Sequence, residues 1–340
     1  MATTGSSAIR IGVLGAAKIA RSFCDGVRPS SKIVVAAVAS RDAGKGRAFA
    51  KDTGIPKVHA TYGALLADPE IDAVYNPLPN NLHAEWSIRA VEAGKHVLCE
   101  KPLATTAADA RAMFDAARRK GVYLVEAYPY RAQPQTLKMR ELLAAMAIGR
   151  LQLVQASFGF PLTDTTNIRM DPALAGGALM DAGCYPVSLV RTVAGERPSR
   201  VHAVAKWAPT GVDRTLLASL EFPSGLLAQV SCSFATIRHR RAFIAGDAGS
   251  IDTTYFNDTS ATFPPLLVVK RGSGWDAQRE LIETAASNGF LAEAESFHDL
   301  IARGWDDWTG VSPEESIDIA LTLEAIAASA RSGAAIDIAS

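Results

Sequence analysis

The sequence predicts a two-domain α/β protein, in which a doubly wound parallel sheet is followed by a domain built on an open, mostly antiparallel sheet. The first observation is length, because the chain has 340 residues and single hydrophobic cores stop growing at roughly 250–300 residues. The second is that residues 1–128 alternate short apolar runs with helical patterns, which is typical of parallel sheets covered on both faces. The third is that residues 129–340 contain strand-like runs that alternate partly with period two, as in antiparallel sheets.

The strands of the first domain are predicted from continuous apolar runs, and its helices from the segments between them. The predicted strands are 9–15, 32–40, 72–76, 96–99 and 122–127. The predicted helices are 17–27, 42–53, 82–93 and 105–120. Because each strand is apolar along its length, we expect both faces of this sheet to be covered.

The second domain is predicted to begin with a helix over 137–147 and to close with a helix that starts at Ser312 and Pro313, an N-cap serine followed by proline. The runs predicted as strands between them are 151–160, 201–207, 216–222, 226–234, 241–244 and 266–270. The segment from Pro223 to Gly225 predicts a hairpin turn between two of these runs. These features favour an open sheet.

Composition and charge exclude several classes of partner. The chain carries 35 basic and 35 acidic residues with no basic cluster, so we expect neither nucleic acid nor an anionic membrane as a partner. We find no apolar run near the ~20 residues of a membrane span, and the first ten residues lack the basic and apolar segments of a secretory signal. The four cysteines have neither CxxC spacing nor histidine neighbours, which predicts free thiols in a reducing cytoplasm and no metal site.

The first candidate site is the turn after the first predicted strand, which reads GVLGAAKIA over residues 12–20. Aligned with the dinucleotide-binding fingerprint, its second glycine is the tight-turn glycine, and two alanines take the later glycine positions. Such a turn directs backbone N–H groups and the positive end of a helix at a pyrophosphate. The residues predicted to bind the dinucleotide here are Gly15, Ala16, Ala17, Lys18 and Ile19. The alternative is a tight βα turn that binds no ligand.

The end of the second predicted strand indicates which dinucleotide is bound. Proteins that bind NAD usually place an acidic residue here, where it holds the ribose 2′-hydroxyl. This chain has Ser40 and Arg41, and a guanidinium matches a 2′-phosphate in charge and geometry. Asp42 is predicted to cap the next helix. The pattern therefore favours NADP over NAD, and the alternative is that Arg41 is a solvated surface residue.

Two later strands end in segments that should lie at the edge of the sheet where doubly wound folds bind ligands. The first segment, YNPLPNNLH, contributes Pro77, Leu78, Asn80 and His83. A proline-rich strand end is rigid and presents carbonyl groups, which suits the lining of a nicotinamide ring. For His83 alone, a structural role at the start of its helix is favoured. The second segment, VLCEKP over 97–102, ends in a charged pair before a proline.

Four segments together resemble the glucose–fructose oxidoreductase/inositol dehydrogenase/MocA family, in the family's order and spacing and across most of the chain. They are GxxGxxxIA from residue 12, PLPNxLHxE from 77, AGKHVLCEKP from 93 and GGALMDAGCYP from 176. Within the family, the chain resembles the branch of NADP-dependent aldose dehydrogenases and trans-dihydrodiol dehydrogenases. That branch has a YRxHPQ motif in which Gln133 here replaces the histidine, so the preferred substrate differs if that histidine touches substrate.

The resemblance implies a hydride-transfer site between the two domains. In such a site Lys101 would hydrogen-bond the reacting hydroxyl, Tyr185 would be the general acid/base, and Asp181 would orient the substrate or the lysine. A neighbouring lysine would lower the pKa of the tyrosine, which is otherwise a poor base at neutral pH. Glu100 and Lys101 are also expected at the cofactor. Pro102 is expected to fix the direction of the lysine through a cis Lys101–Pro102 bond.

Structural explanations stand beside these assignments. A lone lysine at a strand end is usually solvated and a tyrosine before proline is usually packed, so it is the two motifs together that favour catalysis. Asp181 and Tyr185 are four residues apart and share a helix face only if Pro186 leaves that turn intact. Arg131 and Arg169 are candidate contacts to substrate hydroxyls, and surface ion pairs explain them nearly as well.

These expectations combine into an NAD(P)-dependent oxidoreductase that transfers hydride between the nicotinamide and a secondary alcohol or hemiacetal carbon of a sugar, polyol, cyclitol or cyclic diol. The alternatives among enzymes are a trans-dihydrodiol dehydrogenase and a keto-sugar reductase. A non-catalytic NADP-binding sensor is disfavoured because it need not retain Lys101, Asp181 and Tyr185. The open second sheet predicts a homodimer or a dimer of dimers packed through that sheet.

Overall fold

The computed structural model describes residues 8–272, 274 and 277–338, and the chain divides into two compact units. Unit 1 comprises the described residues of 1–103, 108–132 and 287–313, and unit 2 those of 104–107, 133–286 and 314–340. The predicted boundary between residues 128 and 129 differs from this division, because residues 287–313 return to unit 1. The expectation that the N-terminus lacks a secretory signal rests largely on residues 1–7, which lie outside the described residues.

Unit 1 is built on a parallel sheet, which confirms the predicted doubly wound architecture. Its strands are β1 (Ile9–Leu14), β2 (Ile33–Ala39), β3 (Lys57–His59), β4 (Ala73–Asn76), β5 (His96–Glu100) and β6 (Leu124–Ala127). They lie in the order β3-β2-β1-β4-β5-β6, so the direction of winding reverses between β1 and β4. Ligands of such sheets bind beyond the carboxyl ends of the strands at that point. The sequence does not predict β3, which has only three residues.

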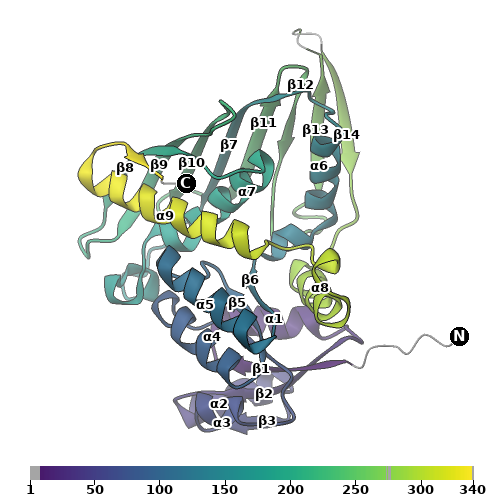
Figure 1. The fold of residues 1–340 in the computed structure, drawn as a ribbon, viewed down its shortest axis with the longest axis vertical. Helices are drawn as coiled ribbons and strands as arrows, with labels where there is room; N and C mark the ends of the chain where they lie inside the picture. Colours follow the sequence, from purple (N-terminus) through teal and green to yellow (C-terminus); the bar gives the residue numbers. More distant parts are fainter. Residues whose placement is uncertain (1–7, 273, 275–276, 339–340) are drawn as a thin grey trace, which may run out of the picture. The chain divides into compact units, whose positions relative to one another are not determined.

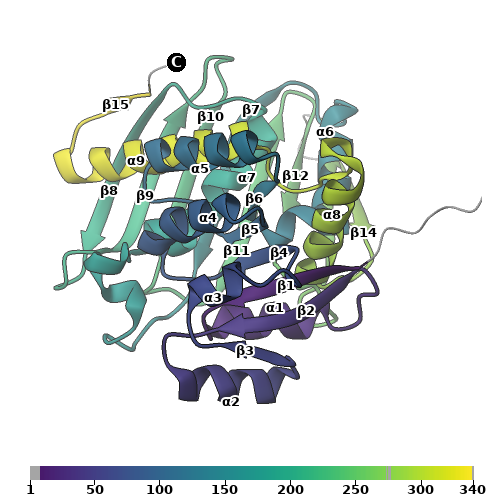
Figure 2. The same cartoon turned by 60° about the horizontal axis from the view of Figure 1, so that its bottom comes forward.

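Helices cover both faces of the sheet of unit 1, with α1 and α8 on one face and α4 and α5 on the other (Figure 2). The helices of this unit are α1 (Lys18–Val27), α2 (Ala43–Thr53), α3 (Tyr62–Leu66), α4 (His83–Glu92), α5 (Ala107–Lys120) and α8 (Gly289–Arg303). Short 3-10 turns occupy Asn80–Leu82, Pro129–Ala132 and Trp305–Asp307. The sequence predicts four of these helices and neither the short α3 nor α8.

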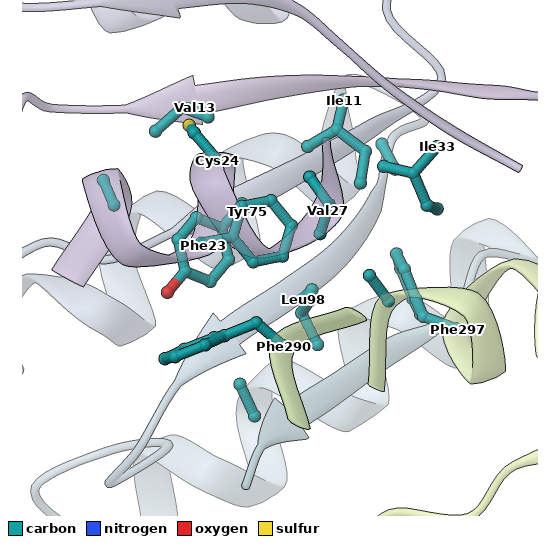
Figure 3. Packing of buried hydrophobic residues seen from close by; sticks show 14 of the residues in the cluster. Ile11, Val13, Phe23, Cys24, Val27, Ile33, Tyr75, Leu98, Phe290 and Phe297 are labelled. Atoms are coloured by element: carbon teal, nitrogen blue, oxygen red, sulfur yellow. The ribbon is translucent and has the colours of Figure 1, made fainter. Parts of the chain in front are cut away.

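Helix α8 belongs to unit 1 because its apolar side is buried against the parallel sheet. Phe290 and Phe297 join the cluster that contains Phe23 of α1, Tyr75 of β4 and Leu98 of β5 (Figure 3). The rings of Phe23 and Tyr75 stack with their centroids 4.0 Å apart. An amphipathic pattern predicts a helix but does not indicate which sheet the helix will cover. The return of the chain to unit 1 could therefore not be predicted from the sequence.

Unit 2 is built on an open sheet that is antiparallel except for the pairing of β7 with β10 (Figure 1). Its strands are β7 (Leu151–Gly159), β8 (Arg200–Trp207), β9 (Asp213–Glu221), β10 (Leu227–Ser233), β11 (His239–Gly246), β12 (Gly249–Thr253), β13 (Leu266–Arg271), β14 (Gln278–Glu283) and β15 (Ile336–Asp337). They lie in the order β14-β13-β12-β11-β7-β10-β9-β8-β15. This confirms the predicted open, mostly antiparallel sheet. The sequence does not predict β12, β14 or β15; the side chains of β14 are almost all exposed, so it has no apolar face to indicate a strand.

The helices of unit 2 lie on one face of this sheet. They are α6 (Pro134–Ala144), α7 (Cys184–Ala194) and α9 (Pro313–Ser332), with 3-10 turns at Ile168–Met170 and Pro172–Leu174 and a π-helical turn at Leu179–Gly183. Helix α7 packs across β7 and β10, and α9 is tied to β8 where Ala203 N donates to Ser329 Oγ at 2.9 Å. Because side chains alternate along a strand, every second residue of these strands points to the opposite face.

Three findings concern membrane spans, disulfide bonds and metal sites, none of which the sequence predicts. The helical run Pro172–Ala194 is long and apolar enough to cross a membrane, although the sequence predicts no such run. It is 67% buried inside the protein, and because the core helix of a soluble protein passes the same test, the run is weak evidence for a span. The four cysteines are free and buried. Within the part of the chain that the structure describes, no group of three histidine, cysteine or acidic residues could hold a metal ion.

Candidate functional site

The turn after β1 has the geometry of a phosphate-binding loop. Gly15 has a φ of +88°, a left-handed conformation that favours glycine, and its N–H donates to the last carbonyl of β2 at 2.7 Å. A Cβ added there would lie 3.2 Å from Leu78 Cδ2. Helix α1 begins directly after Ala17, whose methyl group cannot accept a hydrogen bond, so the N–H groups of the first turn are not capped by that residue. Ala16 and Ile19 pack against the core of unit 1.

The end of β2 carries a hydroxyl and a guanidinium. Ser40 is buried, and its Oγ accepts from Asp42 N at 3.3 Å. Arg41 is exposed. The Asp42 carboxylate accepts from Lys45 N at 3.0 Å and so caps α2, which confirms the predicted cap. The acidic residue that follows β2 is therefore already used as a helix cap, and the exposed Arg41 precedes it in the chain.

The loop after β4 is held by its own side chains. Asn76, the last residue of β4, is fully buried, and its Oδ1 accepts from Leu78 N at 3.3 Å. Pro77 and Leu78 are both buried, and Asn80 opens the 3-10 turn before α4. The predicted lining segment is thus a fixed loop at the carboxyl end of β4.

His83 joins the loop after β4 to the loop after β5. Its Nε2 lies 2.7 Å from Leu78 O and its Nδ1 lies 2.8 Å from Pro102 O. Burial lowers the pKa of His83 to about 4, against the effect of these two carbonyl groups. The neutral ring has a single N–H, so it donates to one carbonyl at a time. The structural role that the sequence favours for His83 therefore has a definite form, in which both ring nitrogens face backbone carbonyls.

The charged pair that ends β5 faces two environments. Glu100 is 4% exposed and accepts from Tyr75 Oη at 2.6 Å. Burial, with the charge of Glu100, raises the pKa of Tyr75 well above its ordinary value, so Tyr75 keeps its proton and donates it. Lys101 is half-buried, and the Lys101–Pro102 bond is cis, as expected.

The buried carboxyl groups of Glu100, Glu126 and Glu293 form a cluster in the interior of unit 1, and the sequence alone does not reveal this cluster. Glu126 and Glu293 are each 1% exposed, and burial raises the pKa of Glu293 well above its ordinary value, with the charges of Glu100 and Glu126 adding to the effect. Arg131 is also 1% exposed, and its Nη2 donates to Gly310 O at 3.1 Å. This predicted substrate contact therefore lies in the interior of unit 1.

In unit 2, the GGALMDAG segment forms the π-helical turn Leu179–Gly183. Gly177 precedes the turn with a φ of +113°, and a Cβ there would collide with Asp213 Oδ1. Asp213 Oδ2 accepts from Leu179 N at 2.7 Å and so fixes the start of the turn. π-Helical turns are rare in proteins, and those that occur often lie at functional sites. Here the turn carries Asp181.

Asp181 and Arg169 form an ion pair, with Arg169 Nε 2.6 Å from Asp181 Oδ2. The arginine side chain is 40% exposed and the carboxylate 15% exposed, so the pair reaches solvent. The next helix, α7, begins at Cys184, and Pro186 falls in its first turn, where an N–H would have no partner within α7. Pro186 therefore does not break the helix that carries Tyr185.

Tyr185 is 3% exposed, and most of the residues around it carry no sequence motif. Its Oη accepts from Asn257 Nδ2 at 3.0 Å. The Arg240 guanidinium lies 3.9 Å from the centroid of the Tyr185 ring and 4.0 Å from that of Phe158. Gln133, which departs from the branch motif, donates from Nε2 to Asn257 O at 2.8 Å. Only Gln133 of this group carries a sequence signal, because the others lie in strands and a loop without a motif.

A doubly wound sheet with a left-handed glycine in its first βα turn, followed in one chain by an open sheet whose helical segment carries an acid and a tyrosine, is the architecture of a nucleotide-dependent oxidoreductase. Residues 9–128 match the model of the oxidoreductase family with an NAD-binding Rossmann fold, and residues 136–252 match the GFO/IDH/MocA C-terminal domain. The chain belongs to the GFO/IDH/MocA oxidoreductase family.

Individual relatives cover most of the chain. It is 38% identical over 331 residues to the D-xylose 1-dehydrogenase (NADP(+)) 2 of Haloferax volcanii, covering 96% of this chain and 99% of the relative. It is 36% identical over 247 residues to the trans-1,2-dihydrobenzene-1,2-diol dehydrogenase of Danio rerio, covering 72% and 74%. Among solved structures, the 3-ketoreductase KijD10 of Actinomadura kijaniata in complex with NADP and TDP-benzene is 30% identical, with a TM-score of 0.86 over 95% of this chain and 98% of that one.

Proposed function

We propose that the protein is an NADP-dependent oxidoreductase that transfers hydride at a secondary alcohol or hemiacetal carbon of a sugar, polyol, cyclitol or cyclic diol. The observation that carries the proposal is the sequence similarity to an NADP-dependent xylose dehydrogenase, which is 38% identical over 331 residues. The dihydrodiol dehydrogenase and ketoreductase relatives support the two alternative substrates, a dihydrodiol and a keto-sugar. The same site serves both oxidation and reduction.

The residues present fit NADP. The left-handed turn at Gly15 and the first turn of α1, which includes Lys18, would hold the pyrophosphate. Ser40 and Arg41 would hold the 2′-phosphate, because Asp42 is used as a helix cap. The loop after β4, from Pro77 to Asn80, would line the nicotinamide. Buried His83 and Glu100 would support this loop and the end of β5 through their internal hydrogen bonds.

The reaction requires a proton transfer alongside the hydride transfer, and the bound nicotinamide accepts or supplies the hydride. Tyr185 is proposed to take the proton of the carbinol hydroxyl in oxidation and to return it in reduction. Lys101 is proposed to donate a hydrogen bond to the same substrate oxygen. Asp181 and Arg169, as a paired acceptor and donor, are proposed to bind further hydroxyl groups.

Following NADPH absorbance with the purified protein and a panel of aldoses, inositols, dihydrodiols and keto-sugars tests the proposal. We expect turnover of at least one class, with NADP(H) preferred over NAD(H). Binding of NADPH without turnover of any substrate by either cofactor would instead support the sensor.

Replacing Arg41 with alanine should weaken NADP binding selectively. Loss of one charge-assisted contact to the 2′-phosphate corresponds to about a ten- to one-hundredfold rise in the Kd for NADP, with little change for NAD. Titration calorimetry with both cofactors measures this. The control is Arg28→Ala, which removes an exposed arginine from the C-terminal end of α1. Equal weakening of both cofactors by Arg41→Ala contradicts the assignment.

A homodimer or dimer of dimers packed through the open sheet is part of the proposal. Val204 and Leu217, cross-strand neighbours on β8 and β9, are each 55% exposed, and they line a hollow on the sheet face opposite α7. Large apolar side chains that are exposed next to each other on an open face favour association. Sedimentation velocity measures the oligomeric state, and a monomer at micromolar concentration is the contrary result.

We also propose a cytoplasmic location for the protein. Its four cysteines are buried free thiols, which is typical of proteins in a reducing compartment.

A further inference from the structure

The orientation of the Asn257 side chain is fixed by its neighbours. Arg240 Nη1 lies 2.8 Å from one end of the Asn257 amide, and a guanidinium can only donate, so that end is Oδ1. The other end, Nδ2, is therefore a donor, and it lies 3.0 Å from Tyr185 Oη. The tyrosine oxygen accepts this hydrogen bond, and its own proton points away from Asn257.

Arg240 is itself held in place. Its guanidinium lies over the rings of both Phe158 and Tyr185, which are nearly perpendicular to each other, and Nη1 also donates to Tyr255 O at 3.3 Å. The residue is 8% exposed, so the cation is largely removed from water. A cation over the face of an aromatic ring is attracted to its electrons, and this attraction grows when the ring bears negative charge.

The backbone at Asn257 is anchored from a different element. Gln133, at the N-cap of α6, donates from Nε2 to Asn257 O at 2.8 Å, and its Oε1 accepts from Thr259 Oγ1 at 3.3 Å. Gln133 is 1% exposed. The loop segment that carries the donor to Tyr185 is therefore tied to α6 as well as to β11.

We propose that Asn257, oriented by Arg240 and anchored by Gln133, is a positioning residue that aims the hydroxyl of Tyr185 and stabilises its phenolate. In the reducing direction the Oη–H bond of Tyr185 breaks, the proton passes to the substrate oxygen, and the tyrosine oxygen keeps the electron pair. The Asn257 donor and the Arg240 cation face the negative charge that forms. The catalytic part of this inference rests on the proposed function; the effect on the ionisation of Tyr185 does not.

Several elements of unit 2 bring charged or titratable groups to the surroundings of Tyr185. Arg240 comes from β11, and Asp181 with its partner Arg169 lies one turn earlier on the helical segment. Strand β10, which packs against α7, contributes Cys232, whose pKa burial raises well above its ordinary value, so it is uncharged at neutral pH. Strand β7 contributes Phe158, and the loop contributes the exposed Asp258 beside Asn257.

The test replaces Asn257 with aspartate, which still accepts from Arg240 but cannot donate to Tyr185 in its ionised form. Carbon-13 NMR of the protein labelled at tyrosine Cζ follows the ionisation of Tyr185, whose signal among the seven tyrosines is assigned with Tyr185→Phe. Losing a hydrogen bond to a charged group, together with the carboxylate charge that aspartate brings beside the tyrosine oxygen, should move this ionisation upward by at least about one pH unit. Arg240→Met, which removes the cation, should move it in the same direction and serves if Asn257→Asp does not fold.

Tyr255→Phe is the matched control. The Tyr255 hydroxyl donates to a backbone carbonyl of β7, Ser157 O, at 2.8 Å and so helps to hold the same loop; its loss should leave the ionisation of Tyr185 unchanged. An unchanged ionisation in folded Asn257→Asp, or an equal shift in Tyr255→Phe, overturns the proposal. Because the measurement needs no substrate, a failure of the proposed function is seen separately, as absent turnover. Where turnover exists, Asn257→Asp should lower kcat more than it changes KM.

Discussion

Replacing Tyr185 with phenylalanine is expected to lower turnover by about 10²–10⁴-fold, the usual contribution of a general acid or base. The phenyl ring keeps the contacts with Phe158 and the Arg240 guanidinium, so the fold of unit 2 should be unaffected. The change removes the atom that exchanges the proton with the substrate oxygen. The measurement is kcat with whichever substrate the panel identifies, together with the Kd for NADPH, which should stay within about twofold because the tyrosine is assigned to proton transfer.

Lys101→Met should cause a loss of the same order, because its ammonium is assigned to the same substrate oxygen. The control for the tyrosine variant is Tyr255→Phe, a buried tyrosine of the same unit that lacks a proposed role in the reaction. The control for the lysine variant is Lys32→Met, which removes an ion-paired lysine from unit 1. Full turnover in either Tyr185→Phe or Lys101→Met would remove the mechanism, whereas loss of turnover in a control would show that the assay reports folding.

The parts of the site that could be predicted are those where a few consecutive residues determine the local geometry. The glycine of the first βα turn, the cap formed by Asp42 and the cis bond after Lys101 each depend on neighbours within a few positions. The order of apolar runs likewise predicts the parallel sheet, because both faces of such a sheet must be covered.

The residues that surround the predicted groups could not be found in this way. Asn257 and Arg240 reach Tyr185 from a loop and a strand that are 72 and 55 positions away, and neither carries a motif. Their place depends on the register of β11 against β7, which pairs Arg240 with Phe158. Glu293 is a similar case, because its burial depends on α8 returning to the parallel sheet. Arg131 and Arg169 show that an arginine in a motif can lie either in the interior or at the surface.

Replacing Glu293 with glutamine is expected to stabilise the protein, and the gain should grow as the pH rises. Burial, with the charges of Glu100 and Glu126, raises the pKa of Glu293 well above its ordinary value in the folded state. Folding then takes up a proton at every pH between the unfolded and folded pKa values. Stability therefore falls as pH rises through this window, by up to about 1.4 kcal/mol per pH unit. Glutamine has nearly the same shape and no charge to lose, so this dependence disappears.

Urea unfolding of wild type and variant between about pH 6 and 8 measures the effect as a widening difference in the free energy of unfolding. Glu295→Gln is the control, because Glu295 lies two residues along the same helix and accepts from Ser30 Oγ at a half-buried position. Its removal should shift stability by a similar small amount at every pH. If Glu293→Gln and wild type instead lose stability in parallel as the pH rises, Glu293 is ionised in the folded protein. The interior of unit 1 would then hold a charged carboxylate at Glu293, which the burial of Glu293 and the charges of Glu100 and Glu126 both oppose.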